Sequence, residues 1–377
     1  MGKLRIGVVG CGNISMTYMR NAALFRDVEL RACADLSADL AAARAREYGI
    51  RAESLDRLLA ADDVDLVLNL TVPNAHYDVS MAALTAGKHV FTEKPLATTS
   101  EHGRLLVAAA AARGLAIGSA PDTFLGAAGR LARHIVDTGA IGRPVTGTAF
   151  MMGRGMEHWH PNPSFYYQPG AGPVLDMGPY YLAMLVHLLG PARRVFAMAA
   201  TGAPERLITA DGPLKGTRFA VGTPTTFNAI VEFAAGALVT VGMSWDVFRH
   251  SNPPIELHGT EGSLRLPDPD TFGGTVALSV GGADWDERST RDAIYGAINW
   301  PYDRPDRANY RMLGLADLAR SVREGRAPRA SGALALHVLE IMEAILDAAG
   351  SGAVQTIQSD TRRPAALSEE EAASFKA

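Results

Sequence analysis

The sequence GCGNIS at residues 10–15 constrains the fold more than any other stretch of this chain. It follows an apolar run at residues 4–9 and opens an amphipathic segment, the order of strand, glycine turn and helix that is typical of dinucleotide sites. Gly10 permits the tight turn and Gly12 lets the backbone approach a pyrophosphate closely, while the first N–H groups of the helix attract the anion. The third position of the pattern holds Ser15 instead of glycine, and its small side chain still allows the helix to pack closely on the strand.

A carboxylate stands at the end of the next expected strand. The strand at residues 29–34 ends in Asp35, whose side chain can accept hydrogen bonds from an adenosine ribose. Asp35 is followed by Leu36 and Ser37 rather than by Arg or Lys, so a 2′-phosphate would meet a like charge. We therefore expect NAD as the cofactor, with NADP disfavoured. The alternative is a plain glycine turn with Asp35 facing solvent.

Expected helices and strands alternate from Asp35 to residue 119. The helices are expected at residues 38–48, 55–60, 75–86 and 100–113, and the strands at residues 64–70, 89–92 and 116–119. Such alternation predicts an α/β fold with a parallel, doubly wound sheet that helices cover on both faces. The strand at residues 64–70 is nearly all apolar, as expected when both of its faces are buried.

The pattern changes near Pro121, and a chain of 377 residues exceeds what one hydrophobic core usually supports. We therefore expect two domains, at residues 1–121 and 122–377. Two runs of alternating apolar residues are joined by a turn at Ala235-Gly236, so the second sheet is expected to be at least partly antiparallel. The elements expected in this half are strands at residues 144–152, 227–233 and 237–245, helices at residues 124–137, 174–189, 308–324 and 333–349, and a polar strap or frayed tail from Ser359.

Composition bears on the classes of partner. A net charge of −4 gives no reason to expect nucleic acid or an anionic membrane as a partner. No uninterrupted apolar run approaches the roughly 18 residues of a membrane span, and no signal-peptide core follows Met1, so a cytoplasmic location is expected. The two cysteines, Cys11 and Cys33, fall in the expected first sheet layer and behave there as small apolar residues, which argues against a disulfide or a cysteine-bound metal.

Two segments follow strands of the first domain, at the edge where open α/β sheets bind ligands: residues 71–76 and residues 93–95. In the second segment Pro95 restricts Lys94 to an extended conformation that presents its ammonium beyond the strand. A lysine held there can bind a substrate hydroxyl, and partial burial can lower its pKa toward a useful acid/base range. The alternatives are an ordinary surface lysine at position 94 and, for His76, either a place in the nicotinamide pocket or a cap on the following helix.

The loop at residues 157–168 is dense in polar donors and aromatic rings. Such a loop suits a carbohydrate, because sugar hydroxyls need hydrogen bonds and sugar C–H faces pack on aromatic side chains. We expect Glu157, Trp159 and His160 to contact substrate. A loop without substrate contacts is the alternative.

Two further polar segments are weaker candidates, one for a metal site and one for a cover over the pocket. A metal site at His158 and His160 would lack a third and a fourth ligand, so no metal is expected. The polar stretch at residues 284–311, which contains Trp300, Tyr302 and Arg304, is a candidate cover for the pocket.

Together these motifs resemble the glucose-fructose oxidoreductase, inositol dehydrogenase and rhizopine-catabolism family (Gfo/Idh/MocA), along essentially the whole chain. The motifs that carry the resemblance are GCGNIS at residues 10–15, PNAH at 73–76, EKPL at 93–96, GAGPVLDMG at 170–178 and HGTEG at 258–262. The resemblance implies an N-terminal Rossmann domain and a C-terminal α/β domain whose large, mostly antiparallel open sheet serves to form a homodimer or homotetramer. It also implies NAD(P)-dependent chemistry on a sugar or cyclitol hydroxyl, with Lys94 at the reacting centre and a cis Lys94-Pro95 peptide bond.

The family pattern places a catalytic Asp and, four residues later, a His on the helix after the glycine-rich turn. This chain has Asp176 in the first place and Tyr180 in the second. The spacing puts both side chains on one helical face, where they can touch the same hydroxyl. Tyrosine is the poorer base at neutral pH, and we expect Lys94 to lower the pKa of the Tyr180 phenol. The alternatives are a helix N-cap role for Asp176 and a packing role for Tyr180.

The expected site residues form three groups. The catalytic residues are Lys94, Asp176 and Tyr180, and the substrate is expected to contact these three together with Glu157, Trp159 and His160. The cofactor is expected to contact Gly10, Gly12, Asn13, Ile14, Asp35, Thr71, Pro73, Asn74, His76, Glu93 and Lys94.

The function expected first is NAD-dependent hydride transfer to or from a secondary alcohol of a sugar, cyclitol or related polyol. A second enzyme class is NAD-assisted cleavage of a glycosidic or other C–O bond, in which no reduced cofactor accumulates. A third reading is a sugar or dinucleotide sensor on the same scaffold. Lys94 together with Asp176 argues against the sensor, because a pure binding protein needs no acid/base pair.

Overall fold

The computed structural model describes residues 2–299 and 307–377, and its N-terminal part is built on a six-stranded sheet in the order β3-β2-β1-β4-β5-β6. All of its strand pairs are parallel, which confirms the doubly wound sheet. Its strands are β1 (Leu4–Val9), β2 (Val28–Ala34), β3 (Arg51–Ala52), β4 (Leu66–Asn69), β5 (His89–Thr92) and β6 (Ile117–Ser119), and its helices are α1 (Asn13–Ala22), α2 (Ala38–Tyr48), α3 (Leu55–Ala60), α4 (Pro73–Thr85) and α5 (Ser100–Ala112).

The glycine turn between β1 and α1 is set by close packing against β4. Gly10 has a φ of 98°, and a Cβ built on it would lie 2.6 Å from the carbonyl of Leu70, so only glycine fits there. Ser15 is fully buried, and its hydroxyl donates a 2.6 Å hydrogen bond to the Gly12 carbonyl. The Ser15 hydroxyl therefore has a hydrogen-bond partner at the start of its own helix, and its small side chain lets α1 lie close to the sheet.

The C-terminal part is built on a nine-stranded sheet in the order β16-β15-β14-β13-β7-β12-β11-β8-β17. Its β7–β12 pair is parallel and the other neighbours are antiparallel, so the sheet is mixed and mostly antiparallel, as expected. Its strands are β7 (Pro144–Met152), β8 (Ala192–Ala200), β11 (Thr226–Phe233), β12 (Leu238–Ser244), β13 (Ile255–Gly259), β14 (Gly262–Leu266), β15 (Thr275–Val280), β16 (Asp286–Ser289) and β17 (Gln355–Thr356), and a separate hairpin joins β9 (Glu205–Leu207) to β10 (Arg218–Ala220).

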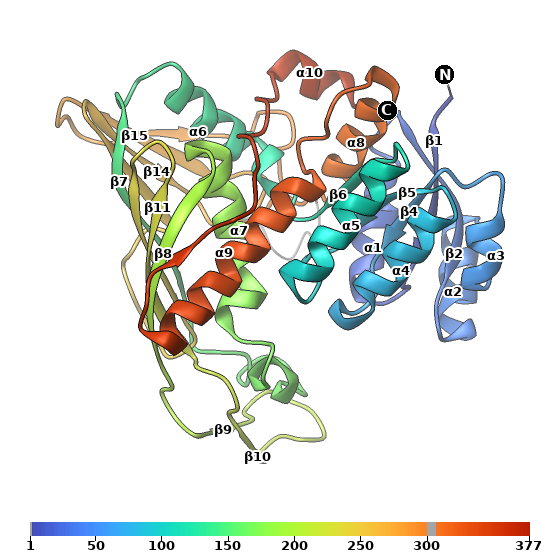
Figure 1. Ribbon diagram of the computed structural model, residues 1–377, viewed down its shortest axis with the longest axis horizontal. Coiled ribbons are helices and arrows are strands. Elements are labelled where there is room, and N and C mark those ends of the chain that lie inside the picture. The colour runs from blue at the N-terminus through green and yellow to red at the C-terminus, as the bar shows by residue number, and fades with distance from the viewer. Residues whose placement is uncertain (1, 300–306) are drawn as a thin grey trace.

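Helices lie between the two sheets (Figure 1). The inner face of the large sheet packs against α7 (Pro173–Leu189) and α9 (Gly332–Ser351), and α9 packs in turn against α5 of the N-terminal part. The opposite face of this sheet carries no helix in Figure 1. The domain limits at 1–121 and 122–377 stay a prediction.

The expected helix at residues 308–324 starts later than the sequence pattern indicates. The observed helix, α8, spans Leu313–Glu324. Met312 has a φ of 110°, outside the helical range, and Asp122 accepts the backbone N–H groups of Met312 and Gly314 at 3.1 and 2.8 Å. The start of the helix is therefore set by a carboxylate about 190 residues earlier in the chain. The expected helix at 124–137 is likewise divided into a 3₁₀ turn, Thr123–Leu125, and α6, Ala127–Asp137.

The last residues form a strap rather than a frayed tail. They run from β17 to the short helix α10 (Glu369–Ser374), and the following Phe375 is fully buried. The carbonyl of Phe375 accepts the Arg26 N–H at 3.0 Å, so the C-terminus is built into the N-terminal part (Figure 1). None of the described helices is long and apolar enough to cross a membrane, and the cytoplasmic location stays a prediction.

Candidate active site

Lys94 lies where the two parts of the chain meet. It follows β5 in a cis peptide bond with Pro95, and its ammonium donates to the Asp176 carbonyl at 2.7 Å and to the Asp176 carboxylate at 3.2 Å. Asp176 lies in the first turn of α7, and both side chains are about four-fifths buried, with 19% and 23% exposed. The N-cap of α7 is Gly172, so the alternative of Asp176 as an N-cap is wrong. The structure thus joins two residues from the expected catalytic group.

The charge state of Lys94 differs from the expectation. Burial is the largest single influence and lowers the pKa of the ammonium. The charge of Asp176 and its hydrogen bond, together with Tyr180 and Glu93, outweigh burial and raise the pKa above its usual value. Lys94 is therefore protonated at neutral pH. The lysine suits the donation of a proton or a hydrogen bond to a substrate oxygen better than it suits the role of a resting base.

Tyr180 lies one turn after Asp176 and faces the same lysine. The Lys94 ammonium is 5.4 Å from the centre of the Tyr180 ring, and Arg311 donates to the phenol oxygen at 3.2 Å. Burial raises the pKa of the phenol to about 12, although the charges of Arg311 and Lys94 act to lower it. Lys94 does act to lower the pKa of this phenol, as expected, but burial outweighs it and the net shift is upward. Tyr180 is a neutral phenol at physiological pH.

The glycine turn has the form that a pyrophosphate requires. A Cβ built on Gly12 would meet no atom within 4 Å, and no side chain caps the N-terminus of α1, which begins at Asn13 and Ile14. Asp35 stabilises the turn, because its two carboxylate oxygens accept the Cys11 and Ser37 N–H groups at 2.7 and 2.8 Å. The residues present therefore fit a dinucleotide whose phosphates lie over Gly12.

The loop after β4 is held together by buried polar contacts. Asn69 accepts both the N–H and the hydroxyl of Thr71, at 3.2 and 2.7 Å. His76 is fully buried, and its two ring nitrogens contact the carbonyls of Thr71 and Pro95 at 2.9 and 2.7 Å. His76 therefore joins the segment at residues 71–76 to the segment at residues 93–95. This arrangement is neither of the two alternatives, a place in the nicotinamide pocket or a cap on the following helix. Pro73 and Asn74 open α4 on the surface beside Thr71.

Glu93 turns away from the edge of the sheet and into the protein. One of its carboxylate oxygens accepts the hydroxyl of Tyr18, which is on α1, at 2.7 Å, and the other accepts the N–H of Lys94 at 2.8 Å. Both Glu93 and Tyr18 are buried. Glu93 thus ties Lys94 to the helix that starts at the glycine turn, which supports an indirect role at the cofactor.

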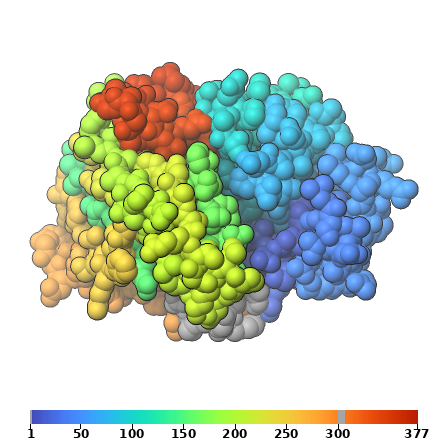
Figure 2. Space-filling view, turned by 90° about the horizontal axis from the view of Figure 1, so that it is seen from below, coloured from blue at the N-terminus to red at the C-terminus, as the bar shows by residue number. Residues whose placement is uncertain are grey.

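The aromatic loop, residues 157–168, is anchored by an ion-pair cluster. Glu157 accepts a 2.9 Å hydrogen bond from Arg206 on β9 and a short one from Tyr167, and Arg206 also pairs with Asp246. The Glu157 side chain is only 12% exposed, so it faces the protein and not open space. In Figure 2 the yellow-green segment with β9 and β10 lies at the front of the molecule and borders the blue N-terminal residues.

The rings of this loop gather around one histidine. The ring centre of His160 lies 5.4 Å from those of Trp159 and Phe165 and 5.5 Å from that of Tyr166. The Trp159 side chain is 55% exposed. Tyr166 is half-buried. Burial has the largest effect on the pKa of its phenol and raises it, the charge of Asp176 also raises it, and the charge of Lys94 lowers it. Tyr166 is therefore close enough to the Lys94–Asp176 pair for both charges to act on its phenol.

Two residues near the pair were not on the expected site list. Tyr166 belongs to the aromatic loop, whose composition was the signal, but the sequence does not show which of its rings turns inward. Arg311 had only its place in the polar stretch at residues 284–311 as a signal. Within that stretch, Trp300, Tyr302 and Arg304 lie outside the described residues.

Comparisons with known proteins match both halves of the chain. Residues 4–120 match the model of the oxidoreductase family with an NAD-binding Rossmann fold, and residues 130–265 match the Gfo/Idh/MocA C-terminal domain. The 1,5-anhydro-D-fructose reductase of Ensifer adhaerens is 30% identical over 267 residues, which cover 69% of this chain and 74% of that protein. An inositol 2-dehydrogenase of Saccharopolyspora erythraea is 29% identical over 292 residues, or 76% of this chain and 80% of that protein.

A solved structure shows the same fold over nearly the whole chain. Levoglucosan dehydrogenase in complex with NADH and L-sorbose superposes with a TM-score of 0.80 at 23% identity, and the match covers 96% of this chain and 100% of that chain. Because both family models match this chain and a relative is 30% identical over 69% of it, the chain belongs to the Gfo/Idh/MocA family of NAD-binding oxidoreductases.

Proposed function

We propose that this NAD-binding oxidoreductase interconverts a secondary hydroxyl and a keto group on a sugar, cyclitol or related polyol. The observation that carries the proposal is the contact of Lys94 with Asp176, 82 residues apart in the chain, at the edge of the cofactor domain. Relatives named as a 1,5-anhydro-D-fructose reductase and an inositol 2-dehydrogenase support the substrate class.

The residues at the pair account for the proton that accompanies hydride transfer. A bound nicotinamide supplies or accepts the hydride. In reduction, Lys94 and Tyr180 donate hydrogen bonds to the carbonyl oxygen, and one proton passes to that oxygen as the C–H bond forms. In oxidation, the hydroxyl proton leaves by the same residues to solvent as the C–H electron pair departs. Asp176 holds the ammonium in place throughout.

The resting protonation favours reduction near neutral pH. The pKa of Lys94 is raised and that of Tyr180 is about 12, so both groups carry their protons at pH 7. Each oxidation event requires one of them to be without its proton, and the fraction in that state grows with pH. We therefore expect the rate of alcohol oxidation to rise from pH 7 to pH 10, while ketone reduction does not rise.

The aromatic loop is the proposed site of sugar recognition. Trp159 offers an exposed ring to C–H faces, and His160 and Tyr166 offer polar atoms beside it. Glu157 is proposed to act at a distance, by holding the loop to β9 through Arg206. This revises its expected direct contact with substrate.

A substrate panel tests the proposed function. The purified protein is mixed with 1,5-anhydro-D-fructose and NADH, and with levoglucosan or myo-inositol and NAD, and the absorbance of reduced nicotinamide is followed. A steady change with any of these confirms hydride transfer. A sugar product that forms without net change in reduced nicotinamide would indicate NAD-assisted bond cleavage instead. Binding of NAD and sugar without any product would indicate a sensor.

The open face of the large sheet is the proposed contact between copies of this chain, in a homodimer or a homotetramer. Its outward side chains include Phe196 and Met198 on β8 and Ile230 on β11, which are 39%, 70% and 49% exposed. Ile230 and Phe196 are paired across the two strands, so the apolar surface is continuous. Light scattering should show an oligomer, and Met198→Glu with Ile230→Glu should shift it toward the monomer. An unaltered oligomer would place the contact elsewhere.

A further inference from the structure

Arg311 meets the phenol of Tyr180 from a segment far along the chain. Its Nη2 lies 3.2 Å from the Tyr180 oxygen, and the two residues are 131 positions apart. The same Nη2 lies 2.6 Å from a carboxylate oxygen of Asp270, and Nη1 contacts the Asn309 side chain at 3.2 Å. The guanidinium is therefore held on more than one side, and the Arg311 side chain is only 14% exposed.

The cofactor domain helps to place this arginine. The side-chain amide of Asn21, at the end of α1, donates to the backbone carbonyls of Arg311 and Asn309, both at 3.0 Å. The helix that begins at the glycine turn thus supports the backbone from which Arg311 extends. Because Asn21 is buried, these hydrogen bonds are shielded from water.

The chemistry of the contact decides where the phenol proton points. A guanidinium has only N–H donors, so the Tyr180 oxygen can only accept from Arg311. The phenol hydrogen must then point away from Arg311, and within residues 2–299 and 307–377 no protein atom accepts it. Among the described residues the hydrogen is therefore available to a substrate oxygen, and the Lys94 ammonium lies 5.4 Å from the centre of the same ring.

The positive charge also acts on the phenol. Burial raises the pKa of Tyr180, and the Arg311 guanidinium is the largest influence in the opposite direction, ahead of Lys94. A phenolate formed for an instant during turnover would be stabilised by the cation that already touches its oxygen. A histidine in this position needs no such partner because its ordinary pKa is near neutral.

We propose that Arg311 is a positioning residue for Tyr180: it directs the phenol hydrogen toward the substrate oxygen and stabilises the phenolate, so that a Tyr–Arg pair acts where the family pattern has a histidine. The inference rests on the proposed function and assigns Arg311 a role at the same site.

The test compares two arginines that bind the same carboxylate. Arg307 also contacts Asp270, at 2.9 Å, and has no contact with Tyr180 among the described residues, so Arg307→Met is the matched control for Arg311→Met. Both are made in the wild-type chain and in Tyr180→Phe, and Arg311→Lys is added to restore the charge without the planar fork. Turnover and KM are measured with the best substrate of the panel between pH 6 and pH 10, with melting temperature and NADH fluorescence as checks of folding.

We expect Arg311→Met to lower kcat about tenfold to a hundredfold, the range for loss of a charge-assisted hydrogen bond, with little change in KM. Its pH profile for oxidation should move to higher pH, because the phenol loses its stabilising cation. Arg311→Lys should recover part of the loss. In the Tyr180→Phe background, Arg311→Met should cost almost nothing further, since the partner is already absent.

Each other outcome has a distinct meaning. Equal losses from Arg311→Met and Arg307→Met, or a full further loss in the Tyr180→Phe background, would overturn the role of Arg311 alone. Wild-type turnover in Tyr180→Phe would remove Tyr180, and Arg311 with it, from the proton path. Absence of hydride transfer by the wild-type chain on the whole panel would overturn the proposed function itself.

Discussion

At the residue scale, the Lys94–Asp176 pair is the centre of the proposed chemistry. The two side chains come from different parts of the chain and are mostly buried, and the charge of each lies beside the opposite charge of the other. We predict that Lys94→Ala and Asp176→Asn each reduce turnover about 10²- to 10⁴-fold, the usual contribution of a general acid or base. The affinity for NADH, followed by its fluorescence, should change little, because neither side chain contacts the glycine turn. Lost cofactor affinity with full turnover at saturation would make Lys94 a binding residue instead.

Also at the residue scale, Asp35 should decide the choice between NAD and NADP. Its two oxygens are occupied by backbone N–H groups, so its charge is held at the end of β2, beside the exposed Leu36. Like charge should weaken NADP binding at least about tenfold relative to NAD. Asp35→Asn should narrow the difference in Kd between the two cofactors, and equal Kd values in the wild-type chain would refute the assignment.

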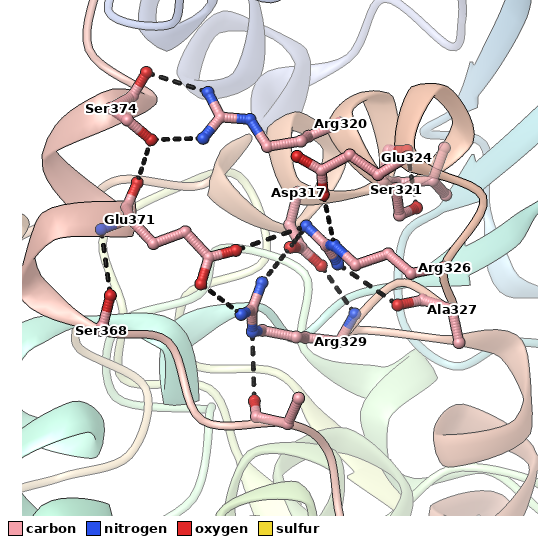
Figure 3. A network of polar contacts seen from close by, with 12 residues as sticks. Asp317, Arg320, Ser321, Glu324, Arg326, Ala327, Arg329, Ser368, Glu371 and Ser374 are labelled. Carbon is pink, nitrogen blue, oxygen red and sulfur yellow. Dashed lines mark hydrogen bonds and ion pairs between the residues drawn. The ribbon is translucent and has the colours of Figure 1, made fainter.

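At the element scale, an ion-pair cluster holds α10 and the strap against α8 (Figure 3). Asp317 on α8 is completely buried and pairs with Arg329 and Arg326 at 2.5 and 2.8 Å. Arg329 reaches Glu371 on α10 at 2.6 Å, and its side chain is only 5% exposed. The strap is thus tied to the helix whose start is set by Asp122, next to the segment that carries Arg311.

Removal of one partner from this cluster should destabilise the protein strongly. Arg329→Met removes a charged partner of the buried Asp317 and leaves it with Arg326 and the backbone N–H of residue 329. We predict a loss of about 3–5 kcal/mol in the free energy of unfolding, measured by urea denaturation. The control is Lys215→Met, which breaks an ion pair whose side chains are 57% and 94% exposed and should cost far less than Arg329→Met. Similar losses in the two variants would mean that the cluster adds no more than a surface pair.

At the scale of the whole molecule, stability should fall in mild acid. His187 is buried in α7 against Phe124, and burial, followed by the charges of Arg133 and Arg363, lowers its pKa well below 6.5. The unfolded chain binds a proton at this histidine below about pH 6.5 and the folded chain does not, so the free energy of unfolding decreases as pH falls from 7 to 5.

The slope of that decrease is the measurable quantity. His187→Phe removes the titrating group and keeps an aromatic ring beside Phe124, so the decrease should become shallower by up to about 1.4 kcal/mol per pH unit. The exposed His250, changed to Ala, is the control and should leave the slope unaltered. An unchanged slope in His187→Phe would assign the acid sensitivity to other groups.

Several features of this protein follow from residues that are close together in the sequence. The alternation of apolar and polar residues predicts the parallel sheet, and the order of strand, GCGNIS turn and helix predicts the dinucleotide site. The motifs around Lys94 and Asp176 predict that both belong to one site, and the structure brings them together. Strand β8 and all the strands after β12 were not predicted, because their sequences lack a regular alternation that stands out from loops.

Other features depend on residues that are far apart in the sequence and meet only in the folded chain. Asp122 moves the start of α8 to Leu313, and Arg206 turns Glu157 into an anchor of the loop. The protonation of Lys94 and Tyr180 follows from burial and from the charges of Asp176 and Arg311, and the sequence shows none of these distances. Charge, burial and hydrogen bonds act through space, so the identity of a residue predicts its chemical type, while its proton and its partner are determined by the fold.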